Sequence, residues 1–199
     1  SIAERLTSKI DIKHESNFFN RVIDLSSAED NFLNQKSTFA GPYHLAKLLR
    51  ILEGDILNRA VINIPTPNGV DAILWESFLE KLAKERPYLW ENHKDAVDTN
   101  FLDPGISSVL TLPTGAGKST LSELKIASCL YSGRKVIYLV PTHALEDQVN
   151  KNLKNLFSEF EPDNIEFDGE FTEIGDIDSF PILVMTPERC LTLLNMSPD

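Results

Sequence analysis

The sequence predicts an α/β fold, in which a mainly parallel sheet is flanked by helices and preceded by a helical N-terminal region. Two observations lead to this prediction. Short apolar runs at 107–112, 135–140 and 182–185 are each followed by a helix-like segment, which is the strand-then-helix alternation of a parallel sheet. Residues 1–85 instead show mostly helical periodicity. We therefore expect a helical accessory region at 1–85 and an α/β domain at 86–199.

Composition sets the outer limits. The chain has 199 residues, of which 42% are hydrophobic and 25% charged, as in ordinary globular proteins. It lacks an apolar run of membrane-spanning length and a secretory leader, so we expect a cytoplasmic protein with no membrane partner. Cys129 and Cys190 lack metal-ligand spacing, and we interpret both as buried thiols.

The accessory region contains helix signals but no recognisable chemistry. Ser26 and Glu29 have capping-box spacing, which predicts a short helix that presents Phe32 and Leu33. Breaking residues at 65–69 separate two amphipathic helices. The first has an apolar face of Leu45, Leu48, Leu49, Leu52 and Ile56, and the second one of Ile73, Leu74, Phe78 and Leu82. A protein partner docking on this helical region is one use that we expect for it.

The chemistry is concentrated at 112–120, which reads Leu-Pro-Thr-Gly-Ala-Gly-Lys-Ser-Thr. Gly115 and Gly117 let the backbone turn so that amide hydrogens converge on phosphate oxygens at the positive end of the next helix. Lys118 would reach the outer phosphates as the catalytic residue, and the Ser119 hydroxyl would hold Mg²⁺. The predicted ATP-binding residues are Thr114, Gly115, Ala116, Gly117, Lys118, Ser119 and Thr120. The alternative is a glycine-rich turn that binds nothing.

The strict phosphate-loop pattern has a further glycine five residues before Gly117, where this chain has Leu112. Without that glycine, Pro-Thr-Gly-Ala-Gly-Lys-Ser-Thr resembles motif I of superfamily 2 helicases and translocases. The resemblance implies a RecA-like P-loop NTPase fold. It also implies that the segment 90–96 corresponds to a helix that often carries an adenine-reading glutamine, at the position of His93. The alternative is a surface helix that contributes only to packing.

Two later segments extend the resemblance. Residues 141–148, Pro-Thr-His-Ala-Leu-Glu-Asp-Gln, are similar to motif Ia, and Thr186-Pro187-Glu188-Arg189 is similar to motif Ib. The resemblance implies that Pro141, Thr142, Thr186 and Pro187 contact the nucleic-acid backbone. The alternative for each threonine is a plain helix cap. A third strand at 165–167, followed by a turn at 168–170 that resembles a small glycine motif, is also expected.

The resemblance covers about 86–199 and stops short of the acidic pair that hydrolysis requires, since no apolar strand here ends in Asp-Glu. It implies the ATP-binding N-terminal part of a larger helicase or translocase, close to the DEAH and Ski2-like branches. This chain alone should bind nucleotide without turning it over.

The implied partner is single-stranded or duplex nucleic acid, either DNA or RNA. The net charge is −11, although residues 113–160 carry +2 and the remainder −13, so charge gives this partner no support. Two alternatives stay open: a P-loop ATPase acting on other substrates, and a non-catalytic module that docks a partner.

Overall fold

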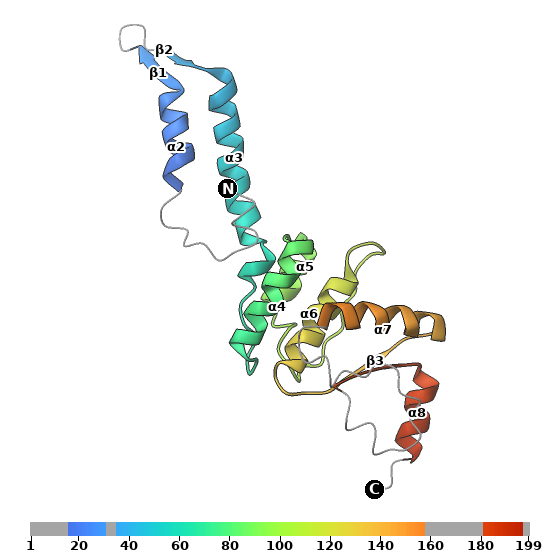
Figure 1. Cartoon of the computed structure of the whole chain (residues 1–199). Coiled ribbons are helices and arrows are strands. Elements are labelled where there is room, and N and C mark those ends of the chain that lie inside the picture. The colour runs from blue at the N-terminus through green and yellow to red at the C-terminus, as the bar shows by residue number, and fades with distance from the viewer. Residues whose placement is uncertain (1–15, 31–34, 158–180, 197–199) are drawn as a thin grey trace. The chain divides into compact units, whose positions relative to one another are not determined.

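The computed structural model describes residues 16–30, 35–157 and 181–196. The chain forms two compact units, Ser1–Thr66 with Ala72–Thr99 and Pro67–Asp71 with Asn100–Asp199. Figure 1 colours the chain from its N-terminus to its C-terminus and labels the elements of each unit.

The first unit begins with two helices joined by a strand pair. Helix α2 (Ser16–Leu25) and helix α3 (Ala40–Asn58) lie side by side in Figure 1, and β1 (Ser27–Asp30) pairs antiparallel with β2 (Gln35–Thr38). The helix predicted from the capping-box spacing of Ser26 and Glu29 is therefore wrong. Pairing with β2, which begins five residues after β1 ends, satisfies the backbone of 27–30, and a capping pattern contains no signal for that partner. Phe32 and Leu33 lie outside the described residues.

The remainder of the first unit is helical and contains its core. A 3₁₀ turn (η2, Val61–Asn63) precedes α4 (Ala72–Glu85) and α5 (Glu91–Asp98). The two predicted amphipathic helices on either side of 65–69 are confirmed. In the second predicted apolar face, Phe78 and Leu82 are buried as expected, but the other buried residues of both helices differ from the prediction. Trp75, Leu79 and Phe78 are fully buried on α4, whereas Ile73 is exposed. The apolar residues that α3 exposes are Leu45, Leu48, Ile51 and Leu52.

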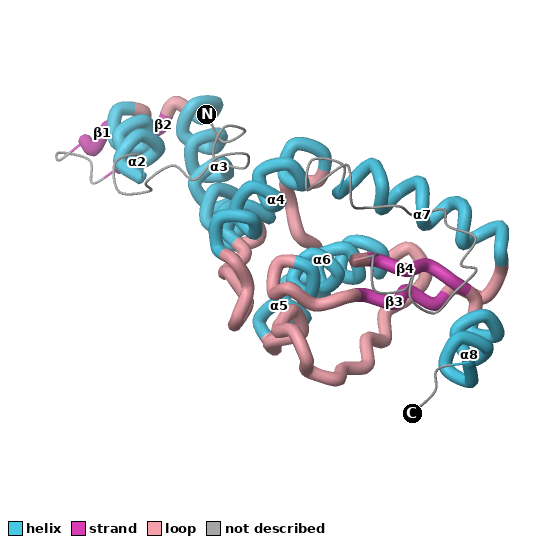
Figure 2. Tube along the Cα trace, turned by 60° about the horizontal axis from the view of Figure 1, so that its bottom comes forward, coloured by secondary structure: helices cyan, strands magenta, loops and turns pink. Residues whose placement is uncertain are grey.

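The second unit alternates helix and strand, as predicted. Helix α6 (Lys118–Leu130) leads to β3 (Val136–Leu139), α7 (His143–Phe157), β4 (Ile182–Met185) and α8 (Pro187–Met196). Figure 2 shows β3 and β4 side by side; they pair in parallel, with Val136 opposite Ile182 and Leu139 opposite Met185. Helix α7 packs against β4, whose four residues are all buried.

Two predictions for this unit do not match the structure. Residues 107–112 are not a strand, and Val109 there is 94% exposed. A strand requires a neighbour to complete its hydrogen bonds, and within the described ranges β3 and β4 pair only with each other. Cys129 and Cys190 are partly exposed free thiols rather than buried ones. The segments 165–167 and 168–170 lie outside the described residues.

Candidate functional site

The loop before α6 has the backbone of a tight, glycine-dependent turn. Gly115 and Gly117 have φ angles of 81° and 73°, in the left-handed region that side chains with a Cβ disfavour. The Ala116 amide donates to the Pro113 carbonyl at 3.2 Å, and the Thr120 amide donates to the Gly117 carbonyl at 3.0 Å. A Cβ built on Gly115 would meet nothing within 4 Å, so glycine is required there by conformation and not by lack of space.

This turn delivers the chain directly into the first turn of α6. Gly117 is the N-cap, and Lys118 and Ser119 are exposed at the first two helical positions. Amides at these positions have no intrahelical acceptor and lie at the positive end of the helix dipole. Thr114 is exposed and Ala116 and Thr120 are partly exposed. The loop therefore combines exposed backbone amides, a lysine and a hydroxyl. This set of groups suits a nucleoside triphosphate with Mg²⁺.

The later part of helix α6, away from that turn, is anchored by residues that the sequence analysis did not single out. The Lys125 ammonium donates to the carbonyls of Phe101 and Asp103 at 2.8 and 2.6 Å, and the buried Ser128 hydroxyl donates to the Leu102 carbonyl at 2.6 Å. Burial lowers the pKa of Lys125 below its ordinary value. These bonds hold 101–103 against α6, and a Lys and a Ser three residues apart on a helix give no sequence signal for them.

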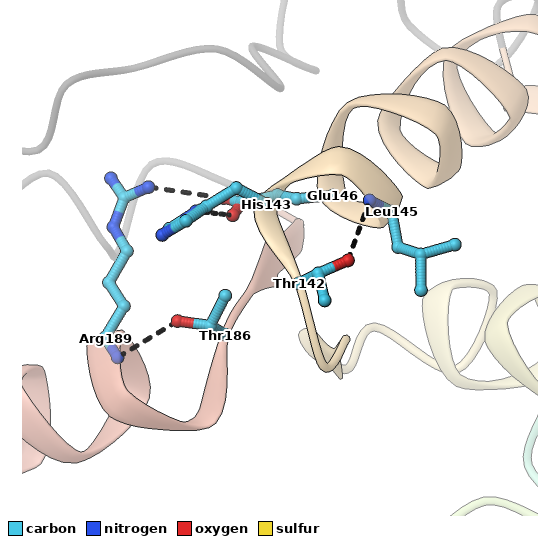
Figure 3. Close-up of polar contacts among 6 residues, drawn as sticks. All are labelled: Thr142, His143, Leu145, Glu146, Thr186 and Arg189. Carbon is cyan, nitrogen blue, oxygen red and sulfur yellow. Dashed lines mark hydrogen bonds and ion pairs between the residues drawn. The ribbon is translucent and has the colours of Figure 1, made fainter.

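A second group of candidate residues follows the two parallel strands. The Val140 amide donates to the Met185 carbonyl at 3.0 Å, which extends the pairing just past β3 and β4. Beyond it, the Thr142 hydroxyl accepts from the Leu145 amide and the Thr186 hydroxyl accepts from the Arg189 amide, both at 3.4 Å (Figure 3). Both threonines thus lie at helix N-caps.

The surroundings of the two threonines differ. Thr142 and the adjoining Pro141 are exposed, whereas Thr186 is buried and only Pro187 beside it is exposed. The structure therefore brings the ends of these two strands together, at one edge of the pair. A ligand at that edge would meet the Thr142 hydroxyl directly, while Thr186 would act through the turn that it caps.

Glu146 connects the two helix starts. Its Oε2 lies 3.0 Å from His143 Nδ1, and its Oε1 lies 3.3 Å from Arg189 Nη1 (Figure 3). Because a carboxylate only accepts, the His143 ring must carry its proton on Nδ1 to make this contact. The sequence analysis missed the contact with Arg189, since the two residues are 43 positions apart.

Comparison of the sequence with known protein families gives a match that contains the glycine loop and the ends of both parallel strands. The family model described as DEAD/DEAH box helicase matches residues 92–198, just over half of the chain. The chain belongs to the DEAD/DEAH box helicase family. No curated protein sequence matches it closely enough to count as a relative. The family match includes the glycine loop, α6, both strands of the parallel pair, and the helices α7 and α8 that follow them.

The matched region of this DEAD/DEAH box helicase chain also includes His93, on α5 in the first unit. His93 is 3% exposed, and the glycine loop belongs to the second unit. An adenine-reading role requires the ring to face a ligand, so this role stays a prediction.

For this helicase-family chain, Mg²⁺ fits a site built largely by the nucleotide. Mg²⁺ in such sites keeps several waters and binds through phosphates with one or two protein carboxylates, and the exposed Ser119 hydroxyl would add a further oxygen ligand. Within the described ranges, no helix is both long enough and apolar enough to cross a bilayer.

Proposed function

We propose that this chain carries the ATP-binding part of a superfamily 2 helicase or translocase, which uses ATP with Mg²⁺ to move along or separate nucleic-acid strands. The observation that carries the proposal is the left-handed glycine turn at Gly115 and Gly117, which opens α6 inside the region matched by the DEAD/DEAH box helicase family. Thr114 to Gly117 would supply amides to the phosphates, Lys118 a charge to the outer phosphates, and Ser119 a hydroxyl to the metal.

The nucleic-acid role rests on the parallel pairing of β3 and β4. Because the carboxyl ends of parallel strands meet at one edge, Pro141 with Thr142 and Thr186 with Pro187 follow the strands on the same side. We propose that these turns hold the sugar-phosphate backbone of single-stranded or duplex DNA or RNA. Hydroxyls and helix-start amides bind phosphates without reading bases, so the contact would position the strand and not select its sequence.

Lys118→Ala tests the nucleotide site. We expect the variant to bind Mg²⁺-ATP or Mg²⁺-ADP more weakly by roughly 1.5 to 3 kcal/mol, the scale of a charge-assisted hydrogen bond. Titration calorimetry on both proteins measures it. Lys151→Ala is the matched control, because Lys151 is an exposed lysine on α7 of the same unit, and its removal should leave the affinity unchanged. Equal affinity for Lys118→Ala and wild type would remove the phosphate-binding assignment.

Two further outcomes identify the alternatives. A wild-type chain that binds no nucleotide at all would be a docking module, with a loop that has lost its ligand. The chain could instead bind nucleotide but no labelled oligonucleotide, whether nucleotide is present or not. That result would identify a P-loop ATPase acting on another substrate. A cytoplasmic location and a protein partner for the helical N-terminal region stay predictions.

A further inference from the structure

We propose that Glu146 is a positioning residue that ties the first turn of α7 to the first turn of α8, so that the turns at Thr142 and Thr186 hold one nucleic-acid strand as a single rigid edge. The inference deepens the proposed function and rests on it. Nothing in the sequence patterns around motifs Ia and Ib pointed to a direct link between them.

The geometry makes Glu146 a bridge between elements and not a local surface ion pair. It is 8% exposed, and each of its oxygens has its own partner, His143 on α7 and Arg189 on α8 (Figure 3). The His143 side chain is 81% exposed and that of Arg189 is 36% exposed. The buried member is thus the carboxylate, and a buried carboxylate that loses its cation is left with an uncompensated charge.

The helix dipoles support the same conclusion. Arg189 lies in the first turn of α8 and His143 begins α7, and a positive charge at a helix N-terminus is unfavourable. Glu146, within the first turn of α7, has the favourable sign. Helix α8 has an acid of its own in the first turn, Glu188, which is exposed. Glu146 adds a buried carboxylate that contacts Arg189 directly, so it compensates the positive charge at the start of α8 from the neighbouring helix.

The link also closes a ring around the two candidate turns. On the strand side, the Val140 amide joins the Met185 carbonyl at 3.0 Å. On the helix side, Glu146 joins Arg189 at 3.3 Å. Thr142 and Thr186 lie between these two connections. Each threonine also caps its own helix, so the spacing of the two turns is held from both directions.

Replacing an acid by its amide separates an effect of charge from an effect of positioning, because the two change nucleic-acid affinity in opposite directions. Removing a negative charge near a phosphate-binding edge should tighten nucleic-acid binding by simple electrostatics. We expect Asp147→Asn, at an exposed acid next to Glu146, to bind a labelled single-stranded oligonucleotide as well as wild type or better. We expect Glu146→Gln to bind it more weakly, by roughly 5-fold or more, because the coupling within a contact network is lost.

The measurements are fluorescence anisotropy with the oligonucleotide and calorimetry with Mg²⁺-ADP on the 199-residue chain. Nucleotide affinity should be the same in Glu146→Gln and wild type, which separates a local effect from general damage. The double variant Glu146→Gln with Arg189→Gln should bind the strand no more weakly than Arg189→Gln alone. Arg189→Lys keeps the positive charge, so it should lose less strand affinity than Arg189→Gln.

The outcomes distinguish the inference from the function on which it rests. The link is overturned if Glu146→Gln binds the strand as tightly as Asp147→Asn does, or if the losses in the double variant are additive. Either result leaves the proposed function standing. A wild-type chain without strand affinity would overturn both. Should circular dichroism show Glu146→Gln unfolded, the exchanged pair Glu146→Arg with Arg189→Glu decides: restored strand affinity supports the link, and its absence overturns it.

Discussion

Single residues determine the shape of the loop ahead of α6. Gly115 adopts a φ of 81° in open space, since a Cβ there would meet nothing within 4 Å. The cost of a side chain at this position is therefore a backbone cost alone. In the proposed nucleotide site the amides beside this position would face a phosphate, so conformation and ligand binding would both depend on Gly115.

Gly115→Ala should destabilise the second unit by roughly 1 to 2 kcal/mol, the cost of a Cβ in the left-handed region. It should also weaken nucleotide binding, because relaxation of φ turns the amides away. Chemical denaturation and calorimetry measure the two effects. Gly115→Asn is the matched control, since asparagine tolerates this conformation better than alanine. If Gly115→Ala and wild type had the same free energy of unfolding, the loop would not need its left-handed backbone.

Among the elements, α6 is the one that connects the candidate nucleotide loop to the body of its unit. Its first turn carries Lys118 and Ser119, while Leu121, Leu124 and Ala127 are fully buried along it. Lys125 and Ser128 bind the carbonyls of 101–103. The helix is therefore held by an apolar face and by polar bonds, which fix the position of its first turn, where the proposed phosphate site lies.

Ser128→Ala should lower the free energy of unfolding by about 1 to 2 kcal/mol, because the fully buried hydroxyl leaves the Leu102 carbonyl without its donor. Chemical denaturation measures the loss. Ser132→Ala is the control: its hydroxyl donates to the Cys129 carbonyl three residues back and is less buried, so its loss should stay below about 1 kcal/mol. Equal losses at the two positions would contradict an anchoring role for Ser128.

For the whole molecule, net charge sets how the chain meets nucleic acid. The formal charge of −11 repels a phosphate backbone at long range. The residues proposed to hold the strand are hydroxyls and helix starts, not a run of lysines. Strand binding should accordingly depend on a few close contacts and little on counterion release.

We expect the 199-residue chain to bind single-stranded oligonucleotides weakly and with a shallow salt dependence. Two lysine or arginine contacts with a single strand would give a slope of roughly −1.4 in log affinity against log salt. Hydroxyls and backbone amides neutralise no phosphate charge, so the slope for this chain should be shallower than that. Anisotropy titrations over a range of salt concentrations measure the slope. A slope several times steeper would mean that a cationic surface elsewhere on the chain binds the strand and that the turns at Thr142 and Thr186 do not.

The sequence by itself determined the elements whose signals are local. Helical periodicity and capping chemistry predicted α3, α4, α6, α7 and α8, the family resemblance predicted α5, and short apolar runs predicted β3 and β4. The glycine spacing predicted the turn into α6 and, through its resemblance, the DEAD/DEAH box helicase family. These features depend on neighbours within a few residues, so the residue order already contains them.

Only the tertiary structure decided what depends on a partner that a local pattern does not specify. The 27–30 segment is a strand because 35–38 pairs with it, and 107–112 is not a strand because no described segment pairs with it. The contact between Glu146 and Arg189 spans 43 positions, and that between Ser128 and Leu102 spans 26. Hydrogen bonds and ion pairs of this kind form between groups that folding brings together, and a local pattern contains no information about which groups will meet.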